Sequence, residues 1–158
     1  MCGITGFIQY RGGAQKDLAQ RCQAMADTII HRGPDAGGVW VDPSFPLALG
    51  HRRLSIIDLS EAGAQPMVSA TGRYVLSFNG EVYNFARLRQ EHGVSAYPYR
   101  GHSDTEVILA AVQHLGVEKS REQIRRYVCA STVGQERTLS VVGAGSGREK
   151  TVVLWMVR

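Results

Sequence analysis

The sequence predicts an α+β domain, or a layered α/β domain, built mainly on antiparallel strands. Strand-like and helix-like segments are mixed, several strand pairs are close enough to form hairpins, and no regular strand–helix alternation appears. A doubly wound parallel sheet is therefore not expected. The chain has 158 residues, 44% of them apolar and 20% charged, which suffices for one domain with a hydrophobic core.

The elements follow from local patterns along the chain. GITGFIQY at the start is rich in β-formers and predicts a strand, and the next segment has apolar residues at helical spacing until it reaches HRGPD. Ser103 is a natural N-cap, and Glu106 occupies the capping-box position. The expected strands are 3–10, 38–41, 47–51 and 74–78, and the expected helices are 16–30, 83–91 and 104–112. Beyond Gly116 a short helix near 120–127 and strands near 138–142 and 151–157 are expected.

The positive charge of the chain is confined to its last 40 residues. Residues 1–118 contain 10 Lys and Arg against 11 Asp and Glu, whereas residues 119–158 contain 8 against 3 and no Asp, Phe or Pro. No basic motif with interleaved aromatic residues accompanies this segment, so it does not indicate nucleic-acid binding. The abrupt change of composition instead predicts a boundary, with one domain over 2–118 and an atypical basic tail over 119–158.

Three cysteines indicate a reducing environment. Cys2, Cys22 and Cys129 are odd in number and widely spaced, which matches neither a disulfide framework nor a zinc motif. No apolar run approaches the roughly 18–20 residues of a membrane span, and no signal-peptide pattern opens the chain. A cytoplasmic protein without a metal site or membrane contact is expected.

Cys2 stands directly behind the initiator methionine. A cysteine thiol is mostly protonated at neutral pH and needs a base beside it to act as a nucleophile. Removal of Met1 would expose the α-amino group of Cys2, which could take the thiol proton directly or through a water. The alternative is that Cys2 is an ordinary buried cysteine at the start of a strand.

Other residues supply what a thiol attacking an amide carbonyl would require. The Asn79 side chain and the Gly80 N–H could stabilise an oxyanion, although Asn-Gly is also a common hairpin turn. Arg53 could bind a carboxylate in bidentate fashion. Glu81 and Asp104 could hold an ammonium group, although a solvated carboxylate and a helix cap are the simpler interpretations. Together these groups fit an amino-acid amide such as glutamine.

Five stretches in order, MCGITGF, HRGPD, GHRRLSIIDLSEAGAQPM, FNGEVYNF and SDTEVIL, cover roughly residues 2–118. They resemble the glutaminase (class II glutamine amidotransferase) domain of glutamine-dependent asparagine synthetases. The resemblance implies an N-terminal-nucleophile hydrolase fold, with two antiparallel sheets between helical layers. It also implies that Cys2 attacks the glutamine side chain, forms a γ-glutamyl thioester and releases ammonia.

The same resemblance assigns the site residues. Asn79 and Gly80 would form the oxyanion hole, Arg53 would bind the substrate carboxylate, and Glu81 and Asp104 would hold its ammonium group. The HRGPD loop would have a structural role. The backbone of four residues would line the pocket: Leu54, Ser55, Ile56 and Ile57.

In this family the ammonia passes to a second domain that uses ATP and Mg²⁺, whereas the glutaminase domain needs no cofactor. No pyrophosphate loop of that domain occurs in the chain, and VVGAGSGREKT does not fit a P-loop. The tail also departs from the family pattern, which predicts a truncated or frame-disturbed gene and an incomplete C-terminal end of the fold. Three interpretations remain open: a glutaminase, as a monomer or a homodimer; a stand-alone subunit that feeds a separate synthetase chain; and an inactive remnant or glutamine-binding module.

Overall fold

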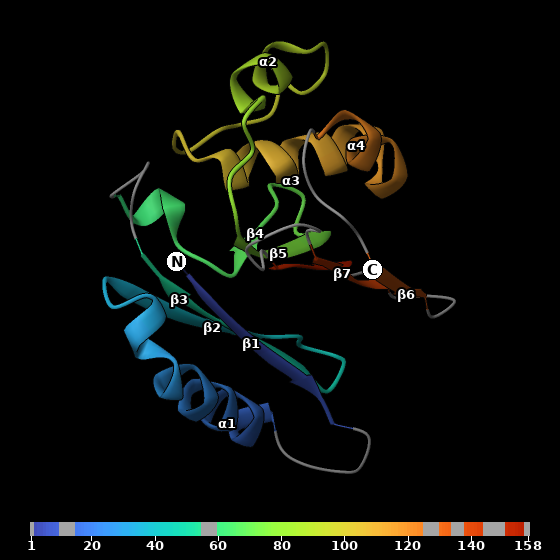
Figure 1. The fold of residues 1–158 in the computed structure, drawn as a ribbon. Helices are drawn as coiled ribbons and strands as arrows, with labels where there is room; N and C mark the ends of the chain where they lie inside the picture. The colour runs from blue at the N-terminus through green and yellow to red at the C-terminus, as the bar shows by residue number, and fades with distance from the viewer. Residues whose placement is uncertain are drawn as a thin grey trace.

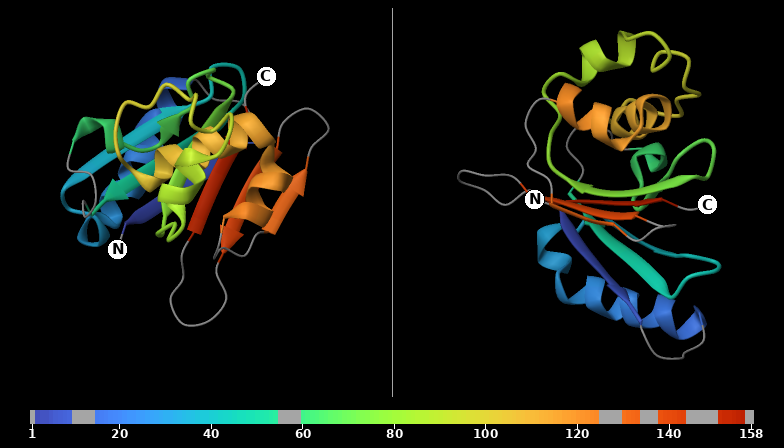
Figure 2. Two further views of the ribbon diagram at one scale, coloured as in Figure 1. Left: turned by 90° about the horizontal axis from the view of Figure 1, so that it is seen from above. Right: turned by 90° about the vertical axis from the view of Figure 1, so that its right-hand side faces the viewer.

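The protein is an α+β domain with two antiparallel sheets and helices on their outer faces. The computed structural model describes residues 2–9, 15–54, 60–124, 130–133, 138–143 and 151–156. Figure 1 and the right-hand view of Figure 2 show the order of the layers: one N-terminal helix, the first sheet, the second sheet, and then the remaining helices. In both views the first strand begins at the end of the first sheet that is nearer the second sheet.

The first sheet consists of β1 (Gly3–Ile8), β2 (Ala36–Val41) and β3 (Leu47–Arg53), in the order β1-β3-β2. Both pairings are antiparallel, and Gly3 is paired with Arg52. Helix α1 (Gln15–Thr28) covers the outer face of this sheet and buries its apolar side against it. A short 3₁₀ helix, η1 (Ile30–Arg32), follows α1 where the sequence predicts that the helix ends.

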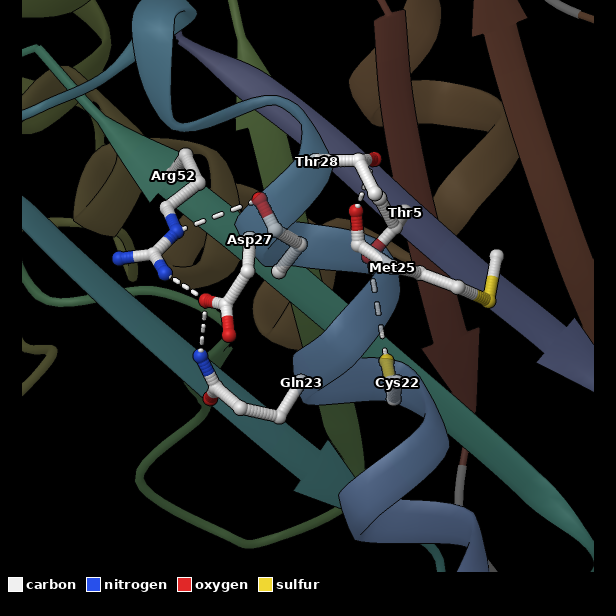
Figure 3. Close-up of polar contacts among 8 residues, drawn as sticks. Thr5, Cys22, Gln23, Met25, Asp27, Thr28 and Arg52 are labelled. Atoms are coloured by element: carbon white, nitrogen blue, oxygen red, sulfur yellow. Dashed lines mark hydrogen bonds and ion pairs between the residues drawn. The ribbon is translucent and has the colours of Figure 1, made fainter.

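Polar contacts hold α1 to the first sheet at two points (Figure 3). The buried Cys22 thiol lies 3.9 Å from the Thr5 hydroxyl of β1. Arg52 of β3 forms an ion pair with Asp27 and donates from Nε to the Ala26 carbonyl at 3.3 Å. A cation at the last turn of a helix also interacts favourably with the helix dipole. These contacts fix β3, whose end carries Arg53, against the helix.

The second sheet contains β4 (Met67–Val68), β5 (Tyr74–Asn79), β6 (Ala130–Val133), β7 (Thr138–Gly143) and β8 (Thr151–Met156), in the order β4-β5-β8-β7-β6. The strand β8, from the basic tail, pairs with β5, so Asn79 lies opposite Thr151. The tail therefore contributes strands to the same sheet as residues 74–79. The division into 2–118 and 119–158, and the truncated or frame-disturbed gene, remain predictions.

The outer face of the second sheet is covered by α2 (Phe85–Gln90), α3 (Asp104–Leu115) and α4 (Val117–Gln123). Apolar residues of α3 and β5 form the main core cluster, which includes Leu76, Phe78, Val107 and Leu109. A further 3₁₀ helix, η2 (Glu61–Gly63), lies between the two sheets in sequence. Among the described residues, no helix is long and apolar enough to cross a membrane.

The structure confirms the predicted elements, with shifts at their ends. The Ser103 hydroxyl caps α3 by accepting from the Glu106 N–H at 3.2 Å, as predicted. The Glu106 carboxylate, however, accepts from the Arg100 and Gly101 N–H groups at 2.8 and 2.9 Å, so it anchors the preceding loop and does not complete a capping box. The helix expected at 120–127 starts at Val117, and residues 125–127 lie outside the described part of the chain.

Candidate active site

Cys2 immediately precedes β1, one residue before the pair formed by Gly3 and Arg52. Its side chain is partly buried and contacts the backbone of Leu54, which directly follows β3. The Leu54 N–H donates to the Cys2 sulfur at 3.4 Å, and the thiol donates to the Leu54 carbonyl at 3.7 Å. An N–H aimed at sulfur can stabilise a thiolate, and partial burial leaves the thiol accessible to a small substrate.

Arg53 ends β3 beside Leu54 and reaches toward η2. Its guanidinium donates from Nη1 to the Ser60 carbonyl at 2.9 Å. A Cβ at Gly63 would overlap the guanidinium, so the absence of a side chain there provides the space that Arg53 occupies. The Arg53 side chain is partly buried, and its backbone lies one residue before Leu54, which contacts Cys2.

The HRGPD loop supports the end of β3, which agrees with the structural role predicted for it. The Asp35 N–H donates to the Arg53 carbonyl at 3.1 Å, and Pro34 forms an isolated bridge with Arg53. Gly33 packs so closely on the backbone at Arg52 that a Cβ would overlap it. The loop thus fixes the backbone from which Arg53 and Leu54 approach Cys2.

Asn79 and Gly80 lie at the end of β5, where the strand turns toward the α3 N-terminus. Asn79 is buried and Gly80 partly buried. Two residues later the Val82 N–H donates to Oδ2 of Asp104, the first residue of α3, at 2.9 Å. The turn of Asn79 through Val82 is therefore attached to the N-terminus of α3.

Asp104 is a buried carboxylate beside Glu81. Burial raises the pKa of Asp104 above its ordinary value, and the negative charge of Glu81 adds to the rise, while the hydrogen bond from Val82 opposes it. Two carboxylates placed together favour a bound cation, because a positive charge offsets both their repulsion and the cost of burying Asp104.

Two residues that sequence reasoning left without a role connect these parts of the site. His51 of β3 is buried, and its Nε2 lies 3.1 Å from the Phe78 carbonyl of β5. Burial lowers its pKa from 6.5 to about 4, so the ring is neutral at pH 7. Gln65 accepts from the Phe78 N–H at 2.6 Å and donates to the Thr105 hydroxyl at 3.3 Å. The signal for His51 in the sequence was its position, since a titratable residue there directly follows the apolar strand segment LALG.

The segments that carry the predicted site residues are thus linked to one another through three contacts. Leu54 connects Cys2 to the end of β3, His51 connects β3 to β5, and Asp104 connects the turn after β5 to α3. The predicted pocket residues Ser55, Ile56 and Ile57 lie outside the described residues, as does Cys129. In the described part of the chain, no cluster of three His, Cys, Asp or Glu side chains could hold a metal ion.

Comparison with known proteins identifies the family. The model of the glutamine amidotransferase domain family matches residues 1–138, which include every predicted site residue. The chain belongs to this family. The match extends into the basic tail as far as the start of β7. Together with the relatives below, it shows that the chain is a class II glutamine amidotransferase domain of the asparagine synthetase type.

The amidotransferase domain is similar to several longer proteins. It is 41% identical over 115 residues to asparagine synthetase [glutamine-hydrolyzing] 1 of Bacillus subtilis, covering 72% of the chain and 18% of the relative. It is 40% identical over 118 residues to asparagine synthetase B [glutamine-hydrolyzing] of Escherichia coli, covering 75% and 20%. It is also 37% identical over 125 residues to amidase chry2 of Gibberella zeae, covering 74% and 18%. The matched segment is thus at most a fifth of the length of these relatives.

Proposed function

We propose that this domain hydrolyses glutamine to glutamate and ammonia with Cys2 as the nucleophile. The observation that carries the proposal is the position of the Cys2 thiol, which is partly buried and contacts the Leu54 N–H directly after β3, the strand whose His51 contacts Phe78 of β5. The layer order of helix, sheet, sheet and helices supports the N-terminal-nucleophile hydrolase fold that the resemblance implies.

The reaction begins once Met1 has been removed. The free α-amino group of Cys2 accepts the thiol proton, and the sulfur attacks the side-chain carbonyl carbon of glutamine. Negative charge then develops on the carbonyl oxygen, where the Asn79 amide and the Gly80 N–H donate hydrogen bonds to it. The C–N bond breaks, the proton held by the α-amine goes to the leaving nitrogen, and ammonia departs. Water then hydrolyses the γ-glutamyl thioester, which releases glutamate and regenerates the thiol.

Substrate recognition uses the charged groups on either side of the thiol. Arg53 binds the α-carboxylate, and Glu81 with Asp104 binds the α-ammonium group. The backbone of residues 54–57 lines the pocket. Both the nucleophile and the charges are supplied by the chain itself, so the hydrolysis requires no cofactor.

We further propose that the ammonia is delivered to an acceptor domain or chain in the cytoplasm. The similar proteins of Bacillus subtilis and Escherichia coli are named as glutamine-hydrolysing asparagine synthetases, and the match covers 18% and 20% of their length. The remainder of such an enzyme, with ATP and Mg²⁺, would use the ammonia. Co-purification of a separate synthetase chain with this protein would support delivery between chains, and glutamate release unchanged by any such chain would count against it.

The decisive experiment tests the α-amine as the base. Intact-mass analysis should show that Met1 is absent, and the purified chain should release glutamate from glutamine. A variant with one alanine inserted before Cys2 keeps the thiol but moves the α-amine away, so its glutamate release should fall at least about a hundredfold. Binding of glutamine without turnover by the unmodified chain would refute hydrolysis and favour a glutamine-binding module. Full activity of the insertion variant would refute the assigned base.

A further inference from the structure

Phe78, the residue before Asn79, has both of its backbone polar groups held by side chains from distant segments. Its N–H donates to Oε1 of Gln65 at 2.6 Å, and its carbonyl lies 3.1 Å from Nε2 of His51. The two contacts span 13 and 27 residues of sequence. We propose that His51 and Gln65 are positioning residues that clamp the Phe78 peptide and thereby hold the Asn79 and Gly80 donors in place for catalysis.

The sheet geometry explains why Phe78 needs this clamp. In an antiparallel strand the N–H and carbonyl of one residue point to the same side. In the β4–β5 pairing, Met67 lies opposite Leu76 and Val68 lies opposite Val75. Continuing this register places residue 65, which lies just before the start of β4, opposite Phe78. Gln65 therefore provides through its side chain the acceptor that a longer β4 would have provided through its backbone.

His51 approaches the same peptide from the facing sheet. The Phe78 carbonyl can only accept a hydrogen bond, so Nε2 of His51 must carry the proton. The ring is almost completely buried, 1% exposed, and Nδ1 has no hydrogen-bond partner among the described residues. A proton on Nδ1 would be buried without an acceptor, which again favours the neutral Nε2–H form.

The clamp connects the oxyanion donors to the other parts of the site. His51 lies on β3, two residues before Arg53, and is paired with Ile4 of β1, two residues after Cys2. Gln65 donates from Nε2 to the Thr105 hydroxyl, next to Asp104. The backbone before the Asn79–Gly80 turn is thus held by His51 and Gln65, and the backbone after it by Asp104 through Val82.

This inference rests on the proposed glutaminase activity, and it predicts an effect on turnover and not on glutamine affinity. Oxyanion donors act mainly in the transition state, so displacing them lowers kcat and leaves KM nearly unchanged. His51→Leu removes the donor and should lower kcat about thirtyfold with KM within about twofold. His51→Gln places an amide N–H near the position of Nε2 and should keep kcat within about threefold of the parent chain. Gln65→Met should lower kcat about tenfold.

Ser77→Ala is the matched control. Ser77 precedes Phe78 on the same strand, is fully buried, and its hydroxyl has no partner among the described residues. The control should therefore retain the parent kcat and KM. If His51→Gln loses as much activity as His51→Leu, or if His51→Leu affects only thermal stability or KM, the clamp is refuted.

A nuclear magnetic resonance measurement on the complete, unmodified chain tests the clamp without activity. The ¹⁵N shifts of the His51 ring should report the neutral Nε2–H tautomer, and the Phe78 and Gly80 amide signals should move in His51→Leu but not in His51→Gln. An Nδ1–H tautomer would overturn the proposal even if the variants lose activity or do not fold. Absence of glutamate release by the parent chain would instead refute the proposed function, and the tautomer and amide signals would still decide whether the clamp exists.

Discussion

Two regions of the molecule contain the same three kinds of side chain in different surroundings. At the interface of α1 with the first sheet, Cys22 is completely buried beside Thr5, and Arg52 is paired with Asp27, whose side chain is 53% exposed. At the junction of the two sheets are a partly buried Cys2, Arg53 and a buried Asp104. The first region attaches a helix, and the second is the candidate active site.

The difference lies in what the polar groups contact. At the helix interface Cys22 contacts the Thr5 hydroxyl and Arg52 pairs with the Asp27 carboxylate, and burial raises the pKa of the Cys22 thiol, which makes it less reactive. At the junction, Cys2 contacts the Leu54 backbone, Arg53 donates to the Ser60 carbonyl, and Asp104 accepts from the Val82 N–H. These contacts fix the three groups in place without requiring that they bind one another. Each residue at the junction therefore has a control of its own type in the other region.

The largest difference is expected between the two cysteines. Cys2→Ala should lower glutamate release at least about a thousandfold, because it removes the nucleophile. Cys22→Ala should retain activity and reduce the free energy of unfolding by about 1–2 kcal/mol, because it leaves a small cavity under α1. Steady-state kinetics and denaturant unfolding of both variants measure this difference. Substantial activity in Cys2→Ala would exclude Cys2 as the nucleophile.

The two arginines should differ in their effect on substrate binding. Arg53→Gln should raise KM for glutamine about ten- to hundredfold, because a charge-assisted contact to the α-carboxylate is lost. Arg52→Gln should leave KM unchanged, since its guanidinium is bound at the end of α1. Initial-rate kinetics over a range of glutamine concentrations distinguish the two. Equal KM values in both variants would remove Arg53 from the substrate site.

The two aspartates should differ in magnitude and in pH dependence. Asp104→Asn keeps an acceptor for the Val82 N–H but loses the charge, so KM should rise about tenfold at pH 7, whereas Asp27→Asn should not change it. The pKa of Asp104 is raised, so as pH falls its carboxylate becomes protonated at a higher pH than an ordinary aspartate. KM of the parent chain should therefore increase as pH falls toward that pKa. This increase should be absent in Asp104→Asn, and its persistence would assign it to another group.

The smallest effect is expected for the ion pair of the helix interface. A double-mutant cycle of Arg52→Gln and Asp27→Asn should give a coupling of about 0.5 kcal/mol in the free energy of unfolding, because Asp27 is exposed and screened by solvent. Denaturant unfolding at low and high salt measures the coupling, which should shrink at high salt. A coupling several times larger would mean that this pair is a main determinant of the position of β3.

The sequence by itself determined most of the local structure and the types of residue in the site. Apolar spacing located α1 and α3, β-forming segments located β1, β3 and β5, and the Ser103 cap depends only on neighbouring residues. Cys2, Asn79, Arg53 and Asp104 could be proposed because their chemistry fits one substrate and their motifs follow one family order. These inferences need no knowledge of which strands face each other.

Only the tertiary structure determined how these residues are held. The contacts of Phe78 with His51 and Gln65 join segments 27 and 13 residues apart, and Glu106 binds the 100–101 backbone where a local rule predicted a capping box. Such contacts depend on how the two sheets face each other and on the residue at which β4 begins. The spacing of apolar residues along the chain predicts neither of these. A buried backbone group must find a partner, but the fold decides which side chain provides it.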